Sequence, residues 1–283
     1  MERVLVTGSG GYIGRFVVKE LLDLGYEVVA ADINNDGVDE RAEKMNVSVF
    51  SEIDNLYEFF GKPDVCIHLA WRNGFVHNSE THMTDLAKHF AFLKQMVDAG
   101  IKKLAVMGTM HEIGYFEGAI DKNTPCAPLS LYGISKNALR DATFAIAKGT
   151  DTIVYWLRAY YILGDDLKNH SIFSKIVQME EAGQKTFPFT SGKNKYDFIS
   201  VHELAKLISL SVGQEEITGI INVCTGDPKS LGEQVEDFIR EHGFKIRPEY
   251  GAFPDRPYDS PAVWGNPDKI MKIIANAVEK HDI

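Results

Sequence analysis

The feature that most constrains the fold of this chain is a glycine-rich segment that directly follows a short apolar run near its N-terminus. Residues 3–7 read RVLVT and residues 8–14 read GSGGYIG. Glycine at these spacings permits a tight turn, a close approach of the backbone to a diphosphate, and close packing of the next helix against the strand. A tight turn alone would also use glycine, but a strand before it and a helix after it favour a phosphate-binding turn at a helix N-terminus.

Apolar runs of strand length alternate with stretches of helical periodicity over the first two thirds of the chain. Nearly all-apolar strands separated by helices are typical of a parallel sheet that is covered on both faces. We therefore predict an α/β fold with a doubly wound parallel sheet, whose ligands lie beyond the carboxyl ends of the strands. The predicted strands are residues 3–7, 27–31, 47–50, 65–70, 103–108 and 152–158, and the helices between them include residues 13–24, 81–99 and 131–148.

The second predicted strand leads into Asp32, about 20 residues after the glycines. A carboxylate there suits hydrogen bonding to the ribose hydroxyls of NAD and repels the 2′-phosphate of NADP. NAD(H) is therefore favoured, and NADP(H) stays open. The alternative interpretation is an ordinary aspartate in the turn that ends the strand.

The regular alternation of strand-like runs and helical stretches ends near residue 164. We predict a Rossmann NAD(P)-binding domain over residues 1–164, with parts of 196–225 returning to it, and a smaller, interleaved C-terminal substrate-binding region over residues 165–283. The helices predicted in the later part are residues 168–181, 202–212, 230–241 and 267–279, with a strand within 219–226.

Composition narrows the class of protein. Hydrophobic residues make up 45% and charged residues 25% of the chain, which is ordinary for a soluble enzyme. No apolar stretch approaches the roughly 20 residues of a membrane span, and no signal peptide is evident. The net charge of −10 argues against nucleic acid or an anionic membrane as partner. Three scattered cysteines, Cys66, Cys126 and Cys224, predict reduced thiols and a cytoplasmic location.

Residues 132–136 read YGISK within a predicted helix, so Tyr132 and Lys136 project from one helix face. A tyrosine phenol has an ordinary pKa of about 10 and is a poor acid–base catalyst at neutral pH. A neighbouring ammonium stabilises the phenolate and brings this pKa toward the working range. The same spacing often occurs by chance on a solvated helix, and the position after the fifth strand of a dinucleotide fold is what favours catalysis.

These motifs together resemble an extended short-chain dehydrogenase/reductase, and more narrowly the nucleotide-sugar epimerase, dehydratase and reductase group. The resemblance rests on TGxxGxxG at the first turn, on Asp32, on His68-Leu69-Ala70 and on Tyr132 with Lys136. Three later segments continue it over essentially the whole chain. They are YDFISVHELA (196–205), GIINVCTG (219–226) and RPYD (256–259).

The resemblance implies that Thr109, at the end of the fifth strand, completes a catalytic triad with Tyr132 and Lys136. Its hydroxyl would hold the substrate oxygen near the phenol, while Lys136 would also bind the nicotinamide ribose. The usual adenine-contacting aspartate after the third strand is missing, so Ser51, Glu52 or Ile53 must take that place. The residues expected to contact the cofactor are Gly8, Gly11, Tyr12, Ile13, Gly14, Asp32, Ile33, Leu69, Ala70, Lys136 and Ile162.

The residues after Thr109 bear on the reaction. Sugar dehydratases of this group carry Thr-Asp-Glu, whereas this chain reads Thr109-Met110-His111. Met110 cannot act as an acid, so elimination of water is disfavoured. The overall pattern looks most like reductases of nucleotide-linked 4-keto-6-deoxy sugars, which serve deoxysugar and surface-polysaccharide biosynthesis.

We therefore predict an NAD(P)H-dependent reductase that converts the C4 ketone of such a sugar to an alcohol. The alternative is a nucleotide-sugar 4-epimerase with tightly bound NAD. A non-catalytic NAD-sensing protein is less favoured, because such proteins are expected to lose the tyrosine or the lysine.

His111 and Glu112 also raise the question of a metal site. Adjacent side chains diverge, and no other cluster supplies further ligands, so no metal is predicted. His111 is either a second proton donor or hydrogen-bond donor to substrate, or a neutral histidine satisfied by backbone. Glu112 is expected to lie in the turn or behind the site.

The substrate pocket is expected to draw on the loop after the fourth strand, on the head of the helix after residue 168, and on the RPYD segment. Trp71 and Arg72 are further candidates, with a plain surface loop as the alternative. A homodimer formed through residues 81–99 and 131–148 is implied by the resemblance. The predicted contacts to a nucleotide-diphosphate sugar are His77, Asn78, His111, Asn169, Ser171, Lys175 and, for the diphosphate, Arg256.

Overall fold

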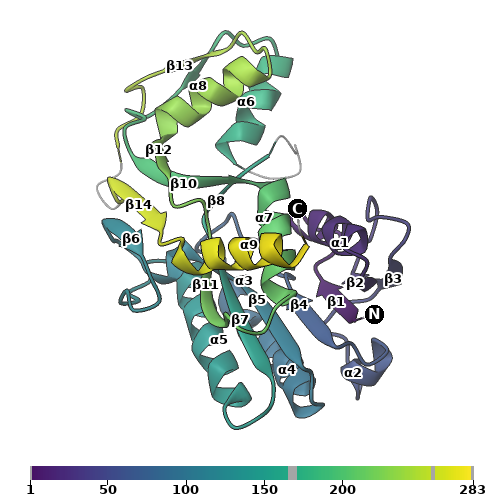
Figure 1. Cartoon of the computed structure of the whole chain (residues 1–283). Coiled ribbons are helices and arrows are strands. Elements are labelled where there is room, and N and C mark those ends of the chain that lie inside the picture. Colours follow the sequence, from purple (N-terminus) through teal and green to yellow (C-terminus); the bar gives the residue numbers. More distant parts are fainter. Residues whose placement is uncertain (1, 165–170, 256–258, 282–283) are drawn as a thin grey trace.

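The computed structural model describes residues 2–164, 171–255 and 259–281. Seven strands form its main sheet: β1 (Arg3–Thr7), β2 (Glu27–Asp32), β3 (Glu43–Asn46), β4 (Val65–His68), β5 (Lys103–Thr109), β7 (Ile153–Ala159) and β11 (Gly219–Val223). Their order is β11-β7-β5-β4-β1-β2-β3, and each neighbouring pair is parallel (Figure 1). The doubly wound sheet predicted from the sequence is confirmed.

Helices cover both faces of this sheet, because successive residues of a strand point to opposite sides. On β1, Val4 and Val6 belong to the core of one face and Leu5 to that of the other, and all three are fully buried. The first face is covered by α1 (Gly14–Asp23), α7 (Val201–Val212) and α9 (Asp268–His281), and the second by α2 (Leu56–Phe59), α4 (Leu86–Asp98) and α5 (Leu131–Ala147).

Among the described residues, no helix has the length and apolar character needed to cross a membrane.

The order of the strands reverses between β1 and β4, which is where a doubly wound sheet leaves a crevice at its carboxyl edge. Gly8 stands in this crevice with a φ of +71°, and a Cβ added to it would lie 2.6 Å from the backbone nitrogen of Ala70. Only glycine combines this left-handed conformation with such a close approach. The predicted glycine turn after β1 therefore lies at the point where the strand order reverses.

One predicted strand is wrong, because residues 47–50 do not form a strand. The edge strand β3 lies four residues earlier and pairs with Val29–Asp32 of β2. After Asn46 the chain leaves the sheet, with the Val47 N–H donating to the Asp32 carbonyl at 2.8 Å. The apolar run is needed for packing rather than for pairing, since Val49 is buried and Phe50 packs partly against the same core.

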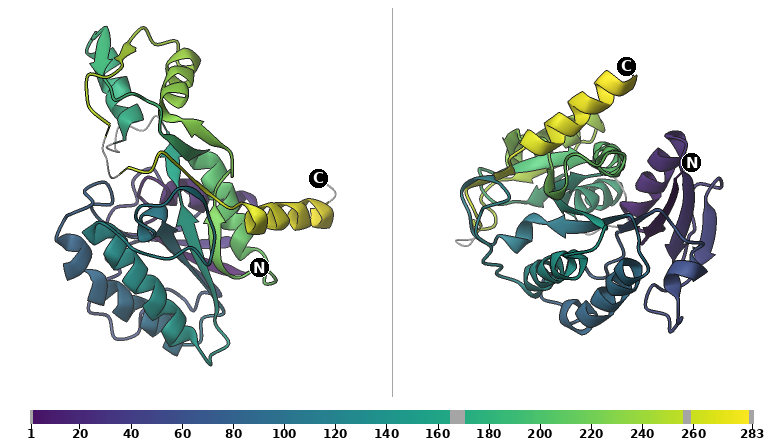
Figure 2. Two further views of the ribbon diagram at one scale, coloured as in Figure 1. Left: turned by 90° about the vertical axis from the view of Figure 1, so that its left-hand side faces the viewer. Right: turned by 60° about the horizontal axis from the view of Figure 1, so that its bottom comes forward.

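A smaller region lies beyond the carboxyl edge of the main sheet (Figure 2). Its sheet has the order β12 (Pro228–Ser230), β10 (Lys195–Ser200), β14 (Ala262–Gly265) and β6 (Gly118–Ile120). A further strand, β8 (Tyr161–Leu163), pairs with the last three residues of β10. The two regions are interleaved, since β6 pairs within the small sheet while β11, α7 and α9 belong to the large one. A boundary at residue 164 stays a prediction. The further elements are α3 (Thr81–Thr84), α6 (Ile172–Glu181), β9 (Thr186–Pro188), α8 (Leu231–Glu241) and β13 (Arg247–Glu249).

Asp197 on β10 ties the two sheets together and is fully buried. Its carboxylate accepts hydrogen bonds from the N–H and the hydroxyl of Thr225 at 2.9 and 2.7 Å. It also accepts from the N–H groups of Gly226 at 2.9 Å and Gly265 at 3.2 Å. Because Thr225 follows β11 of the large sheet and Gly265 ends β14 of the small one, a single side chain fixes the crossing.

We predict that Asp197→Asn lowers the free energy of unfolding by about 1–3 kcal/mol, because the neutral amide replaces a buried carboxylate that accepts from several backbone and hydroxyl donors. Urea unfolding followed by circular dichroism measures the change. Asp227→Asn, an exposed change in the neighbouring turn, is the matched control and should cost less than about 0.5 kcal/mol. Equal losses in the two variants would contradict the role given to Asp197.

Candidate active site

A cleft of about 1570 Å³ opens at the carboxyl edge of the main sheet. This volume exceeds the roughly 300–1,000 Å³ of a pocket for one small ligand, so the cleft has room for two ligands side by side. Its walls include the glycine turn after β1, Asp32 at the end of β2, Thr109 at the end of β5, and Tyr132 and Lys136 on α5. Parallel pairing brings these distant segments to one edge.

The half of the cleft next to β1 is shaped for a dinucleotide. A Cβ added to Gly10 would lie 1.9 Å from the carbonyl oxygen of Asn34, and one added to Gly14 would lie 2.1 Å from that of Gly8. The Asp32 carboxylate accepts from the N–H groups of Gly10 at 3.0 Å and Ile33 at 2.7 Å, which holds it at the mouth of the turn. NAD fits this cradle. Apart from the predicted adenine contact, the residues predicted to contact the cofactor all line the cleft: Gly8, Gly11, Tyr12, Ile13, Gly14, Asp32, Ile33, Leu69, Ala70, Lys136 and Ile162.

The structure differs from the sequence prediction at the place where the adenine contact was expected. Ser51, Glu52 and Ile53 are not among the residues that line the cleft, and residues 47–50 line it instead. The difference follows from the shorter β3, which ends at Asn46 and brings Val47, Ser48, Val49 and Phe50 over the end of β2.

Thr109, Tyr132 and Lys136 all line the cleft. The helix α5 begins after Ser130, whose hydroxyl accepts from the Gly133 N–H at 3.2 Å, so that Tyr132 and Lys136 lie on its first two turns. Burial raises the pKa of Tyr132 to about 12, and a hydrogen bond with Thr109 acts in the opposite direction. The structure thus places the Thr109 hydroxyl at the Tyr132 phenol, and the catalytic roles of Thr109, Tyr132 and Lys136 stay a prediction.

Lys136 is almost entirely buried, and its Nζ donates to the carbonyl of Met107 on β5 at 2.7 Å. Burial lowers the pKa of this lysine to about 7, while the Glu112 carboxylate partly raises it. A proton on Lys136 is therefore costly but present near neutral pH. An ammonium in this position lowers the cost of a phenolate on Tyr132.

Two histidines line the cleft beside Tyr132. The ring of His77 stacks on the tyrosine ring with 5.6 Å between centroids, and His111 lies 4.3 Å from His77. Burial lowers the pKa of His111 to about 3, and the neighbouring His77 adds to this. His111 is therefore a neutral group at the cleft wall rather than a cation. In the described part of the chain, no group of three or more His, Cys, Asp or Glu residues is placed to hold a metal ion.

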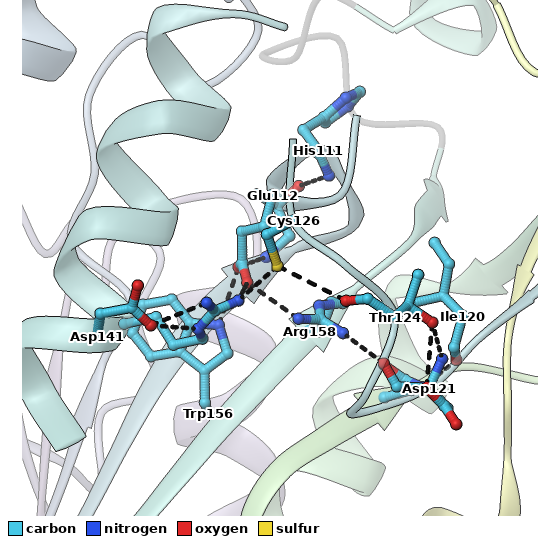
Figure 3. Close-up of polar contacts among 12 residues, drawn as sticks. His111, Glu112, Ile120, Asp121, Thr124, Cys126, Asp141, Trp156 and Arg158 are labelled. Atoms are coloured by element: carbon cyan, nitrogen blue, oxygen red, sulfur yellow. Dashed lines mark hydrogen bonds and ion pairs between the residues drawn. The ribbon is translucent and has the colours of Figure 1, made fainter. Parts of the chain in front are cut away.

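Glu112 points the opposite way (Figure 3) and lies in the turn behind the site, where the sequence analysis expected it. It is completely buried, and its carboxylate accepts from the Thr109 N–H at 2.7 Å and from the Trp156 indole at 2.9 Å. The other oxygen lies 3.3 Å from both Arg140 on α5 and Arg158 on β7. The Thr109 hydroxyl and the Glu112 carboxylate form a capping box around the short turn that follows β5.

Signals for this cluster were present in the sequence. A threonine followed three residues later by glutamate is the pattern of a capping box. A lone arginine, Arg158, within the apolar run of β7 requires a buried partner, because an unpaired buried charge is very costly. The sequence did not indicate that the two signals belong together.

The remaining substrate candidates are placed as follows. Asn78 lines the cleft and its side-chain oxygen accepts from the Leu131 N–H at 3.2 Å, which ties its loop to the start of α5. Ser171 lines the cleft at the start of α6. Lys175 is exposed and does not line it, because α6 turns Ile172 and Phe173 toward the cleft instead. Asn169 and Arg256 lie outside the described residues.

Comparison with known proteins gives one family and consistent relatives. The model of the NAD dependent epimerase/dehydratase family matches residues 4–224. The chain is 45% identical to the dTDP-6-deoxy-L-talose 4-dehydrogenase (NAD(+)) of Aggregatibacter actinomycetemcomitans, over 93% of this chain and 98% of that protein. It is 26% identical to a putative UDP-arabinose 4-epimerase of Arabidopsis thaliana, over 96% of this chain and 71% of the relative.

Solved structures share the fold. The UDP-glucose 4-epimerase of Thermotoga maritima, solved with UDP-glucose, matches with a TM-score of 0.81 and 20% identity over 95% of this chain and 91% of that one. A likeness at this level of identity supports the architecture alone.

We predict that Glu112→Gln lowers the free energy of unfolding by about 3–5 kcal/mol, because it leaves two guanidinium groups facing a neutral amide in the interior. Asp141→Asn is the matched control, since Asp141 binds the same Arg140 from an exposed position, and should cost less than about 1 kcal/mol. Denaturant unfolding of both variants measures the difference. Comparable losses would contradict the interior position of the Glu112 charge.

We predict that Lys136→Met raises the free energy of unfolding near pH 7, because the wild-type protein buries a charge there. Burial lowers the folded-state pKa of Lys136 from 10.5 to about 7. Between these values the unfolded chain holds a proton that the folded chain lacks, so wild-type stability rises with pH. The advantage of the variant should therefore shrink by up to about 1.4 kcal/mol per pH unit toward pH 10.

Urea unfolding at several pH values between these limits measures this change, with Lys148→Met, an exposed lysine at the end of the same helix, as control. An advantage of Lys136→Met that does not vary with pH would contradict the effect of burial.

Proposed function

The chain belongs to the NAD-dependent epimerase/dehydratase family, and on that premise we propose that it reduces the C4 ketone of a dTDP-linked 4-keto-6-deoxy sugar with NADH. It is an NAD-dependent enzyme of the short-chain dehydrogenase/reductase type. The single observation that carries the proposal is the meeting of Thr109, Tyr132 and Lys136 beside the glycine cradle.

The turn after β5 supports a redox step rather than the removal of water. Dehydration needs an acid next to the threonine, and this turn offers no free carboxyl group to the cleft. Met110 is apolar and largely buried, and His111 carries a neutral imidazole. The carboxylate of Glu112 lies in the interior between Arg140 and Arg158.

In the proposed reaction, NAD supplies or accepts the hydride, and the residues of this chain handle the oxygen and its proton. The Thr109 hydroxyl donates a hydrogen bond to the substrate oxygen and holds it next to Tyr132. The Tyr132 phenol gives its proton to that oxygen as the alcohol forms. The Lys136 ammonium stabilises the phenolate left behind, which is then reprotonated from solvent.

The opposite wall of the cleft supports a 6-deoxy sugar. A group of largely buried apolar and aromatic side chains lines the cleft where the small region faces α5. Such a wall suits a methyl group at C6 better than a hydroxyl or a carboxylate, since burying an unpaired polar group is unfavourable. Its members are Met110, Tyr160, Phe173, Tyr196, Phe198 and Val263.

The direction of reduction and the nucleotide are parts of the proposal. The relative from Aggregatibacter is named as an NAD(+)-dependent dehydrogenase at C4, which is the same bond change in reverse. One active site catalyses both directions, so the assay is run from ketone with NADH and from alcohol with NAD. The homodimer implied by the resemblance stays a prediction.

A 4-epimerase is the second candidate, supported by the epimerases among the relatives. It would oxidise and re-reduce one bound sugar with no net turnover of cofactor, and it would keep NAD through purification. A reductase consumes one NADH per sugar and must exchange it. Absorbance of NADH together with chromatography of the sugar products separates the two.

We predict that Tyr132→Phe lowers kcat by about 10²–10⁴-fold, because the proton donor is lost. Thr109→Ala should lower kcat by about 10²-fold, since one hydrogen bond to the substrate oxygen is removed. NAD binding, measured by calorimetry, should be unchanged in both variants. Full activity of Tyr132→Phe would overturn the proposed role of this residue.

A further inference from the structure

Lys136 faces an aromatic ring that comes from a different part of the fold. Its Nζ lies 3.9 Å from the centroid of the Trp71 ring, and the described contacts of this ammonium are that ring and the Met107 carbonyl at 2.7 Å. Trp71 stands three residues after β4 and lines the cleft. A cation over an indole face is stabilised by about 0.5–2 kcal/mol, most strongly where water is excluded.

The indole is fixed in this position on its edge. The Trp71 N–H points at Nδ1 of His82 at 3.0 Å, and Nε2 of His82 lies 3.0 Å from the carbonyl of Val76. An indole nitrogen only donates, so Nδ1 of His82 is the acceptor and its proton is on Nε2. His82 is thereby a neutral histidine of defined tautomer.

The indole is also supported by a histidine ring. His89 on α4 stacks on Trp71, with 4.3 Å between centroids and an interplanar angle of 13°. Nδ1 of His89 is 2.9 Å from Nε2 of His68, and Nδ1 of His68 is 2.8 Å from the Thr7 hydroxyl at the end of β1. Side chains of β1, β4 and α4 thus form one connected path from the glycine turn to Trp71.

The groups that face Lys136 leave the Trp71 indole and the Met107 carbonyl as the close supports of its positive charge. Burial lowers the pKa of His89 to about 3 and holds that of His68 well below its ordinary value, so neither adds a cation. Tyr132 on α5 is neutral, since burial raises its pKa to about 12. The Glu112 carboxylate is the one anion that influences Lys136 in the described part, and Arg140 and Arg158 already engage it.

We propose that Trp71 is a positioning residue of this site, whose indole face, held by His82 and His89, keeps the Lys136 ammonium charged and in place beside Tyr132. The inference rests on the proposed function for its role in catalysis, while the interaction itself belongs to the protein without substrate. Loss of the ring makes the charged form of Lys136 less stable. Lys136 then loses its proton at a lower pH, and Tyr132 loses the cation that stabilises its phenolate.

The direct test titrates Lys136 in the full-length protein without substrate. Trace acetylation by acetic anhydride at a series of pH values, read by mass spectrometry of the Lys136 peptide, gives the pH at which this amine becomes reactive. In Trp71→Leu this midpoint should fall by about one pH unit. Trp71→Phe keeps a weaker aromatic face and should lie between wild type and Trp71→Leu.

Trp264→Phe, which changes a tryptophan on β14 outside the cleft lining, is the matched control and should leave the midpoint unchanged. Because Trp71→Phe retains a ring in the same space, it also serves if Trp71→Leu does not fold. The same midpoint in wild type and Trp71→Phe, with an unchanged midpoint in any folded Trp71→Leu, overturns the proposal.

The activity test separates this inference from the proposed function. In the NADH assay, Trp71→Phe should move the alkaline limb of the kcat–pH profile to lower pH by the same shift, with KM nearly unchanged. A purely structural role would lower kcat equally at every pH, and that result overturns the proposal. Absence of wild-type activity on a nucleotide-linked keto-sugar refutes the proposed function, while the acetylation midpoints still decide the role of Trp71.

Discussion

The site depends on one buried carboxylate. Glu112 receives hydrogen bonds from the Thr109 backbone and the Trp156 indole and pairs with Arg140 and Arg158. These groups come from the end of β5, from β7 and from α5, so a single charge holds together the turn, the sheet and the helix that carry Thr109, Tyr132 and Lys136. A buried charge of this kind is stable only with all its partners present, and this makes the arrangement of the turn unique.

The capping box has a direct consequence for chemistry. Because the Glu112 side chain turns inward to the Thr109 backbone, the preceding residue, His111, is directed to the cleft, where it meets His77. The Glu112 carboxylate is thus used as structural support. The turn keeps the hydroxyl of Thr109 beside Tyr132 and removes the carboxyl group from reach of a substrate.

The ionisation of the site is controlled by exclusion of water. Burial disfavours the charged forms of Tyr132, Lys136 and His111 at once, so the pKa values of three groups that line the cleft are shifted by the same cause. Where water is excluded, a neighbouring indole face or backbone carbonyl has a large effect on the pKa of a buried group. His89 and His111, whose pKa values burial lowers to about 3, therefore act as neutral rings rather than as pH switches.

The sequence by itself determined the doubly wound sheet, the glycine cradle, the acidic residue at the end of β2 and the placement of Tyr132 and Lys136 on one helix, α5. These features follow from local rules, since strand alternation, glycine spacing and helix periodicity act over a few neighbouring residues. The edge strand β3 was misplaced because an exposed edge carries little of the apolar pattern on which such rules depend. The Glu112 cluster, the support of Asp197, and the path from Thr7 through His68 and His89 to Trp71 were decided only by the tertiary structure. Each joins segments that are far apart in the chain, and the sequence does not show which buried polar groups will meet.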